Sequence, residues 1–208
     1  MKPSTCYMCD APATSREHVP PKCIFPDAAE FRKNLITVPS CDEHNLRKSM
    51  DDELLRQIIA CAPGNNDLCL SVVEGGVIPA LERRPHIVDT FLPNLRRVQL
   101  GDYESASYKI PFPRFKSCIG AIVRGLFYAD TGEKLLLELD VGWGPLFPPD
   151  FTKPPFFEPI RRAEQALPPM RRGTNPKVFI YDFDYSPGHT TGFCRLRFYE
   201  GYPIWVVW

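Results

Sequence analysis

Four metal-binding side chains near the N-terminus constrain this 208-residue chain more than any other feature. Cys6 and Cys9 form one pair with two residues between them, and Cys41 and His44 form a second pair with the same gap. A two-residue gap lets a tight turn, or the first turn of a helix, present both side chains of a pair to one ion. The spacing therefore predicts a closed, structural zinc site with four ligands, around which the N-terminal segment folds.

Eight cysteines would also suit a disulfide framework. However, the first ten residues are polar and lack the apolar segment of a signal peptide, and no apolar run reaches a membrane-spanning length. We therefore predict a cytoplasmic chain without a membrane partner, in a reducing compartment where Cys-x-x-Cys indicates a metal site before a disulfide. Cys118 and Cys194 lie on apolar faces and are interpreted as core thiols.

The charge balance neither favours nor excludes a nucleic-acid partner. The chain has 25 basic and 25 acidic residues and a formal net charge of zero, so a nucleic-acid surface has to come from local clusters. Four arginine pairs suit such a surface, but solvated faces that balance the acidic residues are the preferred interpretation. These pairs lie at 83–84, 96–97, 161–162 and 171–172.

Apolar periodicity predicts an α+β fold. Residues 113–130 carry apolar side chains at helical spacing, and Thr131-Gly132 supplies the stop. The tail is expected to form an antiparallel sheet over about 134–208, with its aromatic alternation in the sheet core rather than stacking on bases. The expected strands are 134–141, 178–185, 193–199 and 204–208.

Two further helices are expected near the N-terminus. Ser40 and Glu43 form a capping box, which predicts a helix that starts at Ser40. Ser49 opens a second helix, whereas 71–73 suggests a strand and the glycines at 75–76 a turn. The apolar stripe of the second helix consists of Leu54, Leu55, Ile58 and Ile59.

Taken together, the residues around the four ligands resemble the motif of HNH endonucleases in their cysteine-containing subgroup. Five features occur in order: Cys-x-x-Cys, the acid–His pair Glu17-His18, a mid-loop Asn34, the Cys-x-x-His pair, and Asn45-x-x-Lys48-Ser. This resemblance covers about a quarter of the chain. It implies a ββα-metal fold, in which a two-strand hairpin and the helix that follows it hold a divalent metal ion.

The resemblance also implies a role for each matching residue. His18 corresponds to the general base, Glu17 to the acidic metal ligand beside it, and Asn34 to the residue that orients the base. Asn45 falls where the family binds the catalytic metal from its helix. Lys48 matches a basic position one turn later, where it could contact phosphate.

These roles agree with the chemistry of phosphodiester hydrolysis. A neutral imidazole near pH 7 can take a proton from water, and a hard cation can neutralise charge that develops on phosphate. Oxygen ligands from Glu17 and Asn45 suit Mg²⁺ or Mn²⁺ better than zinc. The chain is thus expected to be a metal-dependent endonuclease on DNA that carries structural zinc and catalytic Mg²⁺ or Mn²⁺.

Two modules are expected, with the nuclease in residues 1–60 and an α+β domain in residues 61–208. The second domain carries no recognisable chemical motif, so target choice or contact with protein partners is its expected role. The alternative is a non-catalytic zinc module that binds DNA or a protein partner. Such a module would keep the four zinc ligands but would have no use for Glu17 and His18.

Overall fold

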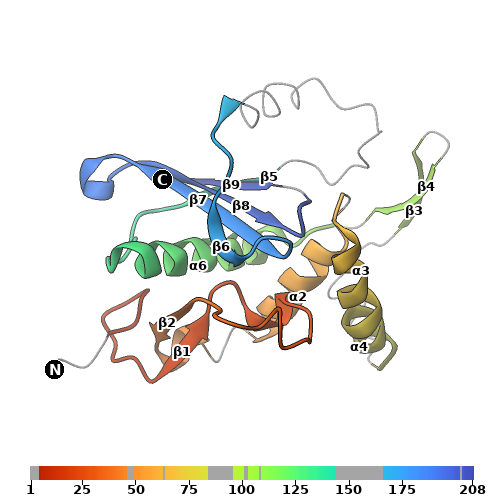
Figure 1. The fold of residues 1–208 in the computed structure, drawn as a ribbon, viewed down its shortest axis with the longest axis horizontal. Helices are drawn as coiled ribbons and strands as arrows, with labels where there is room; N and C mark the ends of the chain where they lie inside the picture. The colour runs from red at the N-terminus through yellow and green to blue at the C-terminus, as the bar shows by residue number, and fades with distance from the viewer. Residues whose placement is uncertain are drawn as a thin grey trace.

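The protein folds as a mixture of helices and antiparallel sheets, with one long helix between two sheet layers (Figure 1). The α+β class predicted from periodicity is thereby confirmed. The computed structural model describes residues 5–45, 49–62, 64–83, 96–100, 103–107, 109–143, 166–201 and 203–208.

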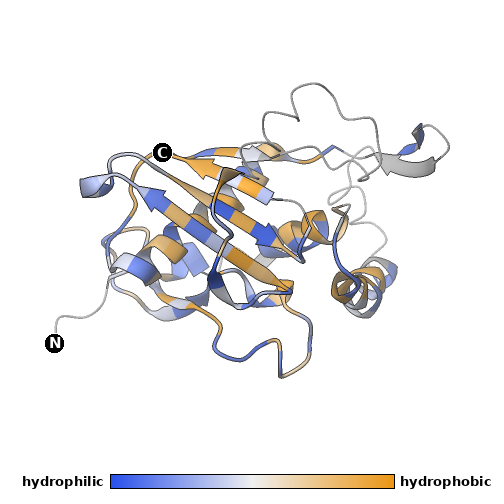
Figure 2. Cartoon of the chain, turned by 45° about the horizontal axis from the view of Figure 1, so that its top comes forward, coloured by the Kyte–Doolittle hydropathy of each residue, from blue (hydrophilic) through white to orange (hydrophobic). Residues whose placement is uncertain are grey.

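The larger layer is a five-stranded antiparallel sheet in the C-terminal part, with strand order β5-β9-β8-β7-β6. Alternate residues of its strands turn apolar side chains to one face, which Figure 2 shows as alternating orange and blue bands. The aromatic residues Phe179, Tyr181 and Phe183 are buried on that face, as the alternation predicted. The strands are β5 (Asp140–Trp143), β6 (Arg172–Asn175), β7 (Phe179–Tyr185), β8 (Gly192–Phe198) and β9 (Pro203–Val207).

Helix α6 (Phe112–Thr131) lies against this sheet and corresponds to the helix predicted over 113–130. It ends where Gly132 adopts the left-handed conformation with φ 76°, which glycine accommodates without strain. On the sheet side, the ring of Phe127 packs edge-on against Phe183 and Trp208. On another side, Gly125 leaves room for Val19 of the N-terminal part, so the helix is buried from two directions.

The smaller layer is an N-terminal hairpin. Strand β1 (Ser15–His18) pairs antiparallel with β2 (Thr37–Ser40), and a short helix α1 (Asp42–Asn45) follows directly. The 3₁₀ turn η1 (Lys22–Ile24) lies between the two strands in sequence. Because the helix begins at Asp42, Ser40 is not its cap as the capping box suggested, and its hydroxyl donates to Glu17 at 3.3 Å instead.

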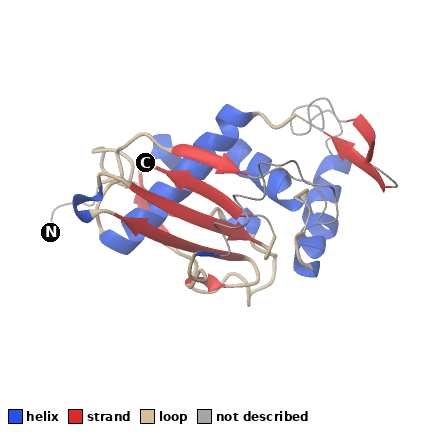
Figure 3. Cartoon of the chain, turned by 90° about the horizontal axis from the view of Figure 1, so that it is seen from above, coloured by secondary structure: helices blue, strands red, loops and turns tan. Residues whose placement is uncertain are grey.

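Four helical segments and a separate hairpin also belong to the described chain (Figure 3). The predicted apolar stripe of α2 is confirmed, since its four side chains are at most 5% exposed. A hairpin that the sequence did not predict projects away from the other layers (Figure 1). The segments are α2 (Ser49–Ala60), α3 (Asp67–Val72), η3 (Val73–Val77), α4 (Ile78–Arg83), β3 (Arg96–Leu100) and β4 (Tyr103–Ser107).

Three expectations after the second helix were wrong. The apparent strand at 71–73 lies in α3 and the first residue of η3, and the glycines at 75–76 lie inside the π-helical segment η3 instead of a turn. The strand expected over 134–141 begins only at Asp140. Both expected strands were predicted from a short β-branched or apolar run, whereas packing against neighbouring elements decides the conformation of such runs.

One set of packed apolar side chains joins the N-terminal hairpin, the helices and the large sheet, with members from Cys6 to Val206. Ala60 is itself packed against this set, and the predicted division into two modules at residue 60 stays a prediction. Among the described residues, no helix combines the length and apolar character needed to cross a lipid bilayer.

Candidate metal centre

The first ligand pair lies on a tight turn that is fixed to the hairpin by backbone hydrogen bonds. The Cys6 amide donates to the carbonyl of Ala11 at 2.9 Å, which closes the turn that carries Cys6 and Cys9. The Tyr7 amide donates to the carbonyl of Pro39 at 2.9 Å and so holds the turn against β2. The second pair follows β2 immediately, with Cys41 before α1 and His44 within it. Hairpin pairing therefore brings together two ligand pairs that are 32 residues or more apart.

The ligand atoms of these four residues all lie within 4.8 Å of one another, as the spacing predicted. The Nδ1 atom of His44 lies 3.5, 3.6 and 3.2 Å from the sulfur atoms of Cys6, Cys9 and Cys41, and the sulfur atoms of Cys9 and Cys41 are 3.8 Å apart. A tetrahedral zinc ion with ordinary bond lengths requires sulfur–sulfur edges of roughly 3.8 Å and sulfur–nitrogen edges of roughly 3.6 Å. The Cys₃His cluster thus has the dimensions of a four-ligand zinc site that leaves no position for substrate.

Electrostatics also favour a metal at this cluster. Burial alone would raise the pKa of Cys6, but hydrogen bonds from the backbone of Met8 and Cys41 outweigh it and lower the pKa to about 7. A thiol with such a pKa ionises readily, and the thiolate is the form that binds zinc. The Met8 amide donates to the Cys6 sulfur at 3.4 Å, so the turn itself prepares this ligand.

All eight cysteines of the chain are free, so the structure contains no disulfide bond. Cys118 and Cys194 are buried in the apolar core, which confirms their interpretation as core thiols. Cys23 is half-buried near the hairpin, and burial, followed by the charge of Asp52, raises its pKa to about 12. Cys23 is therefore an unreactive thiol at neutral pH.

A cavity of about 280 Å³ opens beside the Cys₃His cluster and brings together three residues that the motif singled out. Glu17 and His18 line it from the end of β1, and Asn45 lines it from the last position of α1. The hairpin places the two strand residues next to the helix that carries Asn45, although 27 positions separate His18 from it in the sequence. We refer to this space as the Glu17 cavity.

Glu17 is the most buried acidic residue at this cavity, with 6% of its surface exposed. Ser40 donates its hydroxyl to the carboxylate at 3.3 Å. Burial, and then the negative charge of Glu17, raise the pKa of the nearby Tyr7 hydroxyl well above its usual range, so Tyr7 stays protonated. The hydroxyl groups of Ser40 and Tyr7 therefore lie close to the buried Glu17 carboxylate.

His18 and Asn45 each present a group that suits the chemistry expected of them. Burial, and then the positive charge of Lys22, lower the pKa of His18 below its usual range, so the neutral imidazole prevails near pH 7. The Asn45 amide nitrogen donates to the Ser15 hydroxyl at 2.8 Å. That bond uses the donor end of the amide and leaves the oxygen, which is the end that binds cations.

Two other motif residues are not brought into this group. Asn34 lies in the exposed loop before β2 with a left-handed φ of 53°, and it does not line the Glu17 cavity. Its predicted role in orienting His18 stays a prediction. Lys48 lies outside the described residues.

Motif matching missed two acidic residues that the fold adds to the cavity. Asp52 and Glu53 belong to α2, which follows the hairpin in sequence, and both line the Glu17 cavity. The signal available was an acidic run directly after the motif, in the first turns of the predicted second helix. Acidic residues are also favoured at the start of a helix by the helix dipole, so this run by itself does not indicate a cavity.

The Glu17 cavity and the Cys₃His cluster differ in their fit to a metal ion. Within the described part of the chain, the Cys₃His cluster is the one group of three or more His, Cys, Asp or Glu ligand atoms that close in around a common point. Mg²⁺ does not need such a group, since it retains several waters and is bound by one or two carboxylates together with substrate phosphate. Glu17, His18, Asp52 and Glu53, which line the Glu17 cavity, do not form such a group.

Comparisons with known proteins provide no family for the chain. No family model matches it, and neither the curated proteins nor the solved structures contain a significant match. The similarity to HNH endonucleases consequently rests on the motif residues and their arrangement alone.

Proposed function

We propose that this protein is a metal-dependent endonuclease that hydrolyses DNA phosphodiester bonds, with His18 as general base. The observation that carries the proposal is the convergence of Glu17, His18 and Asn45 on one cavity beside a Cys₃His cluster. A zinc module that served only as a structural clip would not require an acid, a neutral imidazole and an amide oxygen around one opening.

In this proposal the two metal ions have separate roles. Zinc, held by Cys6, Cys9, Cys41 and His44, fixes the turn to the start of α1 and thereby sets the spacing between β1 and Asn45. Glu17 and Asn45 would hold a Mg²⁺ or Mn²⁺ ion, which supplies positive charge to the phosphate that is being cleaved. The carboxylates of Asp52 and Glu53 add negative charge that favours cation binding in the same cavity.

His18 takes a proton from the attacking water in this scheme. The imidazole has its lowered pKa because it is partly desolvated and lies near Lys22. A neutral imidazole accepts a proton, whereas an imidazolium cannot, so the surroundings keep the base in its working form. Asn34 is proposed to orient the ring when substrate is bound, and Lys48 to contact phosphate.

The test is nicking of supercoiled plasmid DNA by the zinc-loaded full chain with added Mg²⁺ or Mn²⁺. His18→Ala should reduce the rate by about 10²- to 10⁴-fold, which is the usual contribution of a general base. His189→Ala is the matched control, because His189 pairs with Glu133 away from the cavity. It should nick at nearly the wild-type rate, and thermal melting should show that both variants are folded.

Equal nicking by His18→Ala and the wild type would contradict the assignment of the base. The rival function, a non-catalytic zinc module for DNA or a protein partner, makes a different prediction. It expects no nicking by any of the three proteins with either ion, together with DNA or partner binding that is insensitive to Glu17→Gln and His18→Ala.

A further inference from the structure

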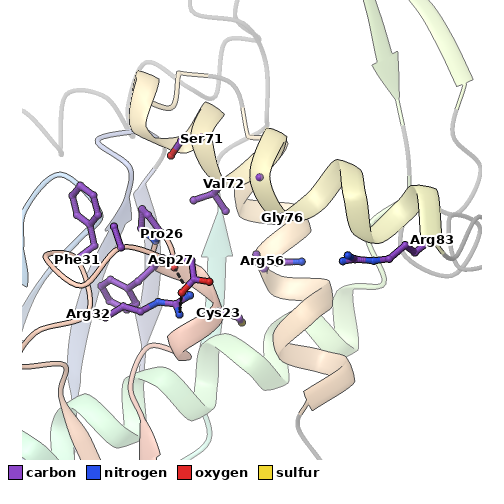
Figure 4. A pocket seen from close by; sticks show the side chains of 13 residues that line it. Cys23, Pro26, Asp27, Phe31, Arg32, Arg56, Ser71, Val72, Gly76 and Arg83 are labelled. Atoms are coloured by element: carbon purple, nitrogen blue, oxygen red, sulfur yellow. Dashed lines mark hydrogen bonds and ion pairs between the residues drawn. The ribbon is translucent and has the colours of Figure 1, made fainter.

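A second cavity, of about 440 Å³, lies next to the Glu17 cavity and is lined by basic side chains (Figure 4). Three elements enclose it: the loop from Cys23 to Arg32, helix α2, and the continuous segment α3–η3–α4. Cys23 lines both cavities, and Glu53 of the first forms an ion pair of 2.5 Å with Arg56 of the second. The two spaces are therefore neighbours on one side of the fold.

The charges that line this second cavity are unbalanced. Arg32, Arg56 and Arg83 contribute three positive charges, whereas Asp27 is the one acidic residue among its lining. Arg32 already pairs with Asp27 and donates to the Phe25 carbonyl at 3.1 Å. Arg56 pairs with Glu53, and Arg56 and Arg83 extend toward one another from α2 and α4 (Figure 4). We call this space the arginine cavity.

Two of the three guanidinium groups have a hydrogen-bond donor without a partner. The buried Nε atoms of Arg32 and Arg56 have no hydrogen-bond partner, and the described residues supply no ion pair to Arg83. A buried donor without a partner is costly, and the positive charge of Arg83, which the described carboxylates do not balance, favours an anion. An anion with several acceptor oxygens would satisfy both needs, and guanidinium forks match phosphate oxygens well.

A glycine permits this arrangement. A Cβ atom added to Gly76 of η3 would lie 2.9 Å from Nη1 of Arg56, so the absence of a side chain lets the guanidinium rest against the helix. The preceding Gly75 has open space, with nothing within 4 Å of an added Cβ. Neither glycine adopts a left-handed conformation, so an alanine at either position suits the helical backbone equally.

We propose that the arginine cavity binds a backbone phosphate of the same DNA strand whose cleaved phosphate enters the Glu17 cavity. This inference rests on the proposed function for the identity of the ligand. The adjacency of the two cavities gives one strand a continuous path from the acidic, metal-binding opening to the basic one. Phosphate contacts of this kind hold a strand in position without reading its sequence.

The experiment measures binding of a fluorescein-labelled DNA duplex by anisotropy, with zinc-loaded full-length protein, no other divalent ion, and a series of salt concentrations. The double variant Arg56→Gln/Arg83→Gln should bind roughly 100-fold more weakly, at about tenfold for each charge-assisted contact. The slope of log affinity against log salt should fall by about 1.8, because two phosphate contacts are lost.

A matched control removes the same charge elsewhere. Lys109→Gln/Lys116→Gln changes two lysines that line neither cavity, and it should weaken binding far less. Equal losses in the two double variants would overturn the inference, since they would reflect net charge alone. Undetectable DNA binding by the wild type would overturn it as well.

The two glycines provide a second test that leaves the charge unchanged. Gly76→Ala should displace the Arg56 guanidinium and weaken DNA binding by several-fold, while Gly75→Ala should bind like the wild type. Identical binding by both variants would contradict the proposed position of the phosphate. Because an alanine favours a helical backbone, a loss of binding by Gly76→Ala is not expected to arise from unfolding.

Failure of this inference can be distinguished from failure of the proposed function. If the wild type nicks plasmid and the arginine variant binds DNA normally, the arginine cavity proposal is wrong and the nuclease proposal stands. If no protein nicks plasmid but the arginine variant alone loses DNA binding, the cavity binds backbone phosphate and the nuclease proposal fails.

Discussion

The N-terminal hairpin region and the large sheet with α6 are stabilised in different ways. Around the hairpin, several of the most buried groups are polar or metal-binding, among them Cys6, Glu17 and Ser40. Between the sheet and α6 the buried groups are aromatic and aliphatic, such as Phe127, Phe183 and Leu196. The hairpin region has few long apolar runs of its own, and a metal ion held by the Cys₃His cluster would add to its stability. The cavity with polar walls lies in the hairpin region. There, the carboxylate of Glu17 and the imidazole of His18 line an opening instead of packing into an apolar core.

The largest effect is expected from breaking the metal site. Cys41→Ser removes one ligand of the Cys₃His cluster and should unfold the region 5–45. We expect loss of most of the roughly 10–16 kcal/mol that structural zinc contributes to small zinc modules at neutral pH. Zinc content by elemental analysis, together with hydrogen exchange across the hairpin, measures this change.

Cys61→Ser is the matched control for that variant. Cys61 is a free, exposed cysteine outside the cluster, so the same substitution there should leave one zinc per chain and an unchanged melting temperature. A Cys41→Ser protein that retained zinc and hairpin protection would show that apolar packing alone holds this region. The contrast between the two regions would then be wrong.

A smaller effect is expected from the apolar region. The ring of Phe127 is 1% exposed and packs against Phe183, Tyr185 and Trp208. Phe127→Ala should reduce the free energy of unfolding by about 3–5 kcal/mol, as measured by urea denaturation. The folded variant should still contain one zinc ion, which separates a core defect from a ligand defect.

Leu136→Ala serves as the comparison for Phe127→Ala. Leu136 is 69% exposed, so its truncation should change the free energy of unfolding by less than about 0.5 kcal/mol. Similar losses for both variants would mean that the sheet and α6 do not form the main apolar core.

The sequence allowed prediction wherever one local rule and the tertiary contacts agree. Apolar residues at helical spacing predicted α6 and the stripe of α2, and strict alternation predicted β7. The four zinc ligands could be predicted as well, because tetrahedral coordination limits the sequence spacings at which two side chains can bind one ion. Such features depend on a few residues near one another in sequence or on a rigid coordination rule.

Long-range contacts decided the parts that could not be predicted. Arg195 lies on the face of β8 opposite the apolar Cys194 and Leu196, yet it is 3% exposed, because it donates to Asp182 and to the Pro168 carbonyl. Asp52 and Glu53 enter the Glu17 cavity only because α2 packs beside the hairpin. The three arginines of the second cavity, at positions 32, 56 and 83, come from three different segments, and no spacing rule joins them.

The smallest expected effect concerns the contact through which the two regions meet. A Cβ atom on Gly125 of α6 would lie 2.7 Å from Cγ2 of Val19, immediately after the end of β1. Gly125→Ala should therefore cost about 1–3 kcal/mol of unfolding free energy by overpacking, despite the better helix propensity of alanine. Gly120→Ala in the same helix meets chiefly the flexible end of Arg124 at 3.0 Å, and it should be neutral or slightly stabilising.

A double-mutant cycle determines whether this contact couples the regions. Val19→Ala removes the methyl groups that an alanine at 125 would meet, so the combined variant should lose less stability than the two single variants added together. Because Val19 follows His18, Gly125→Ala should also disturb the Glu17 cavity, and Val19→Ala should relieve part of that disturbance in the nicking assay. Additive free energies would mean that the hairpin shifts freely on α6. In that case zinc, and not packing on the helix, would be what holds His18 in place.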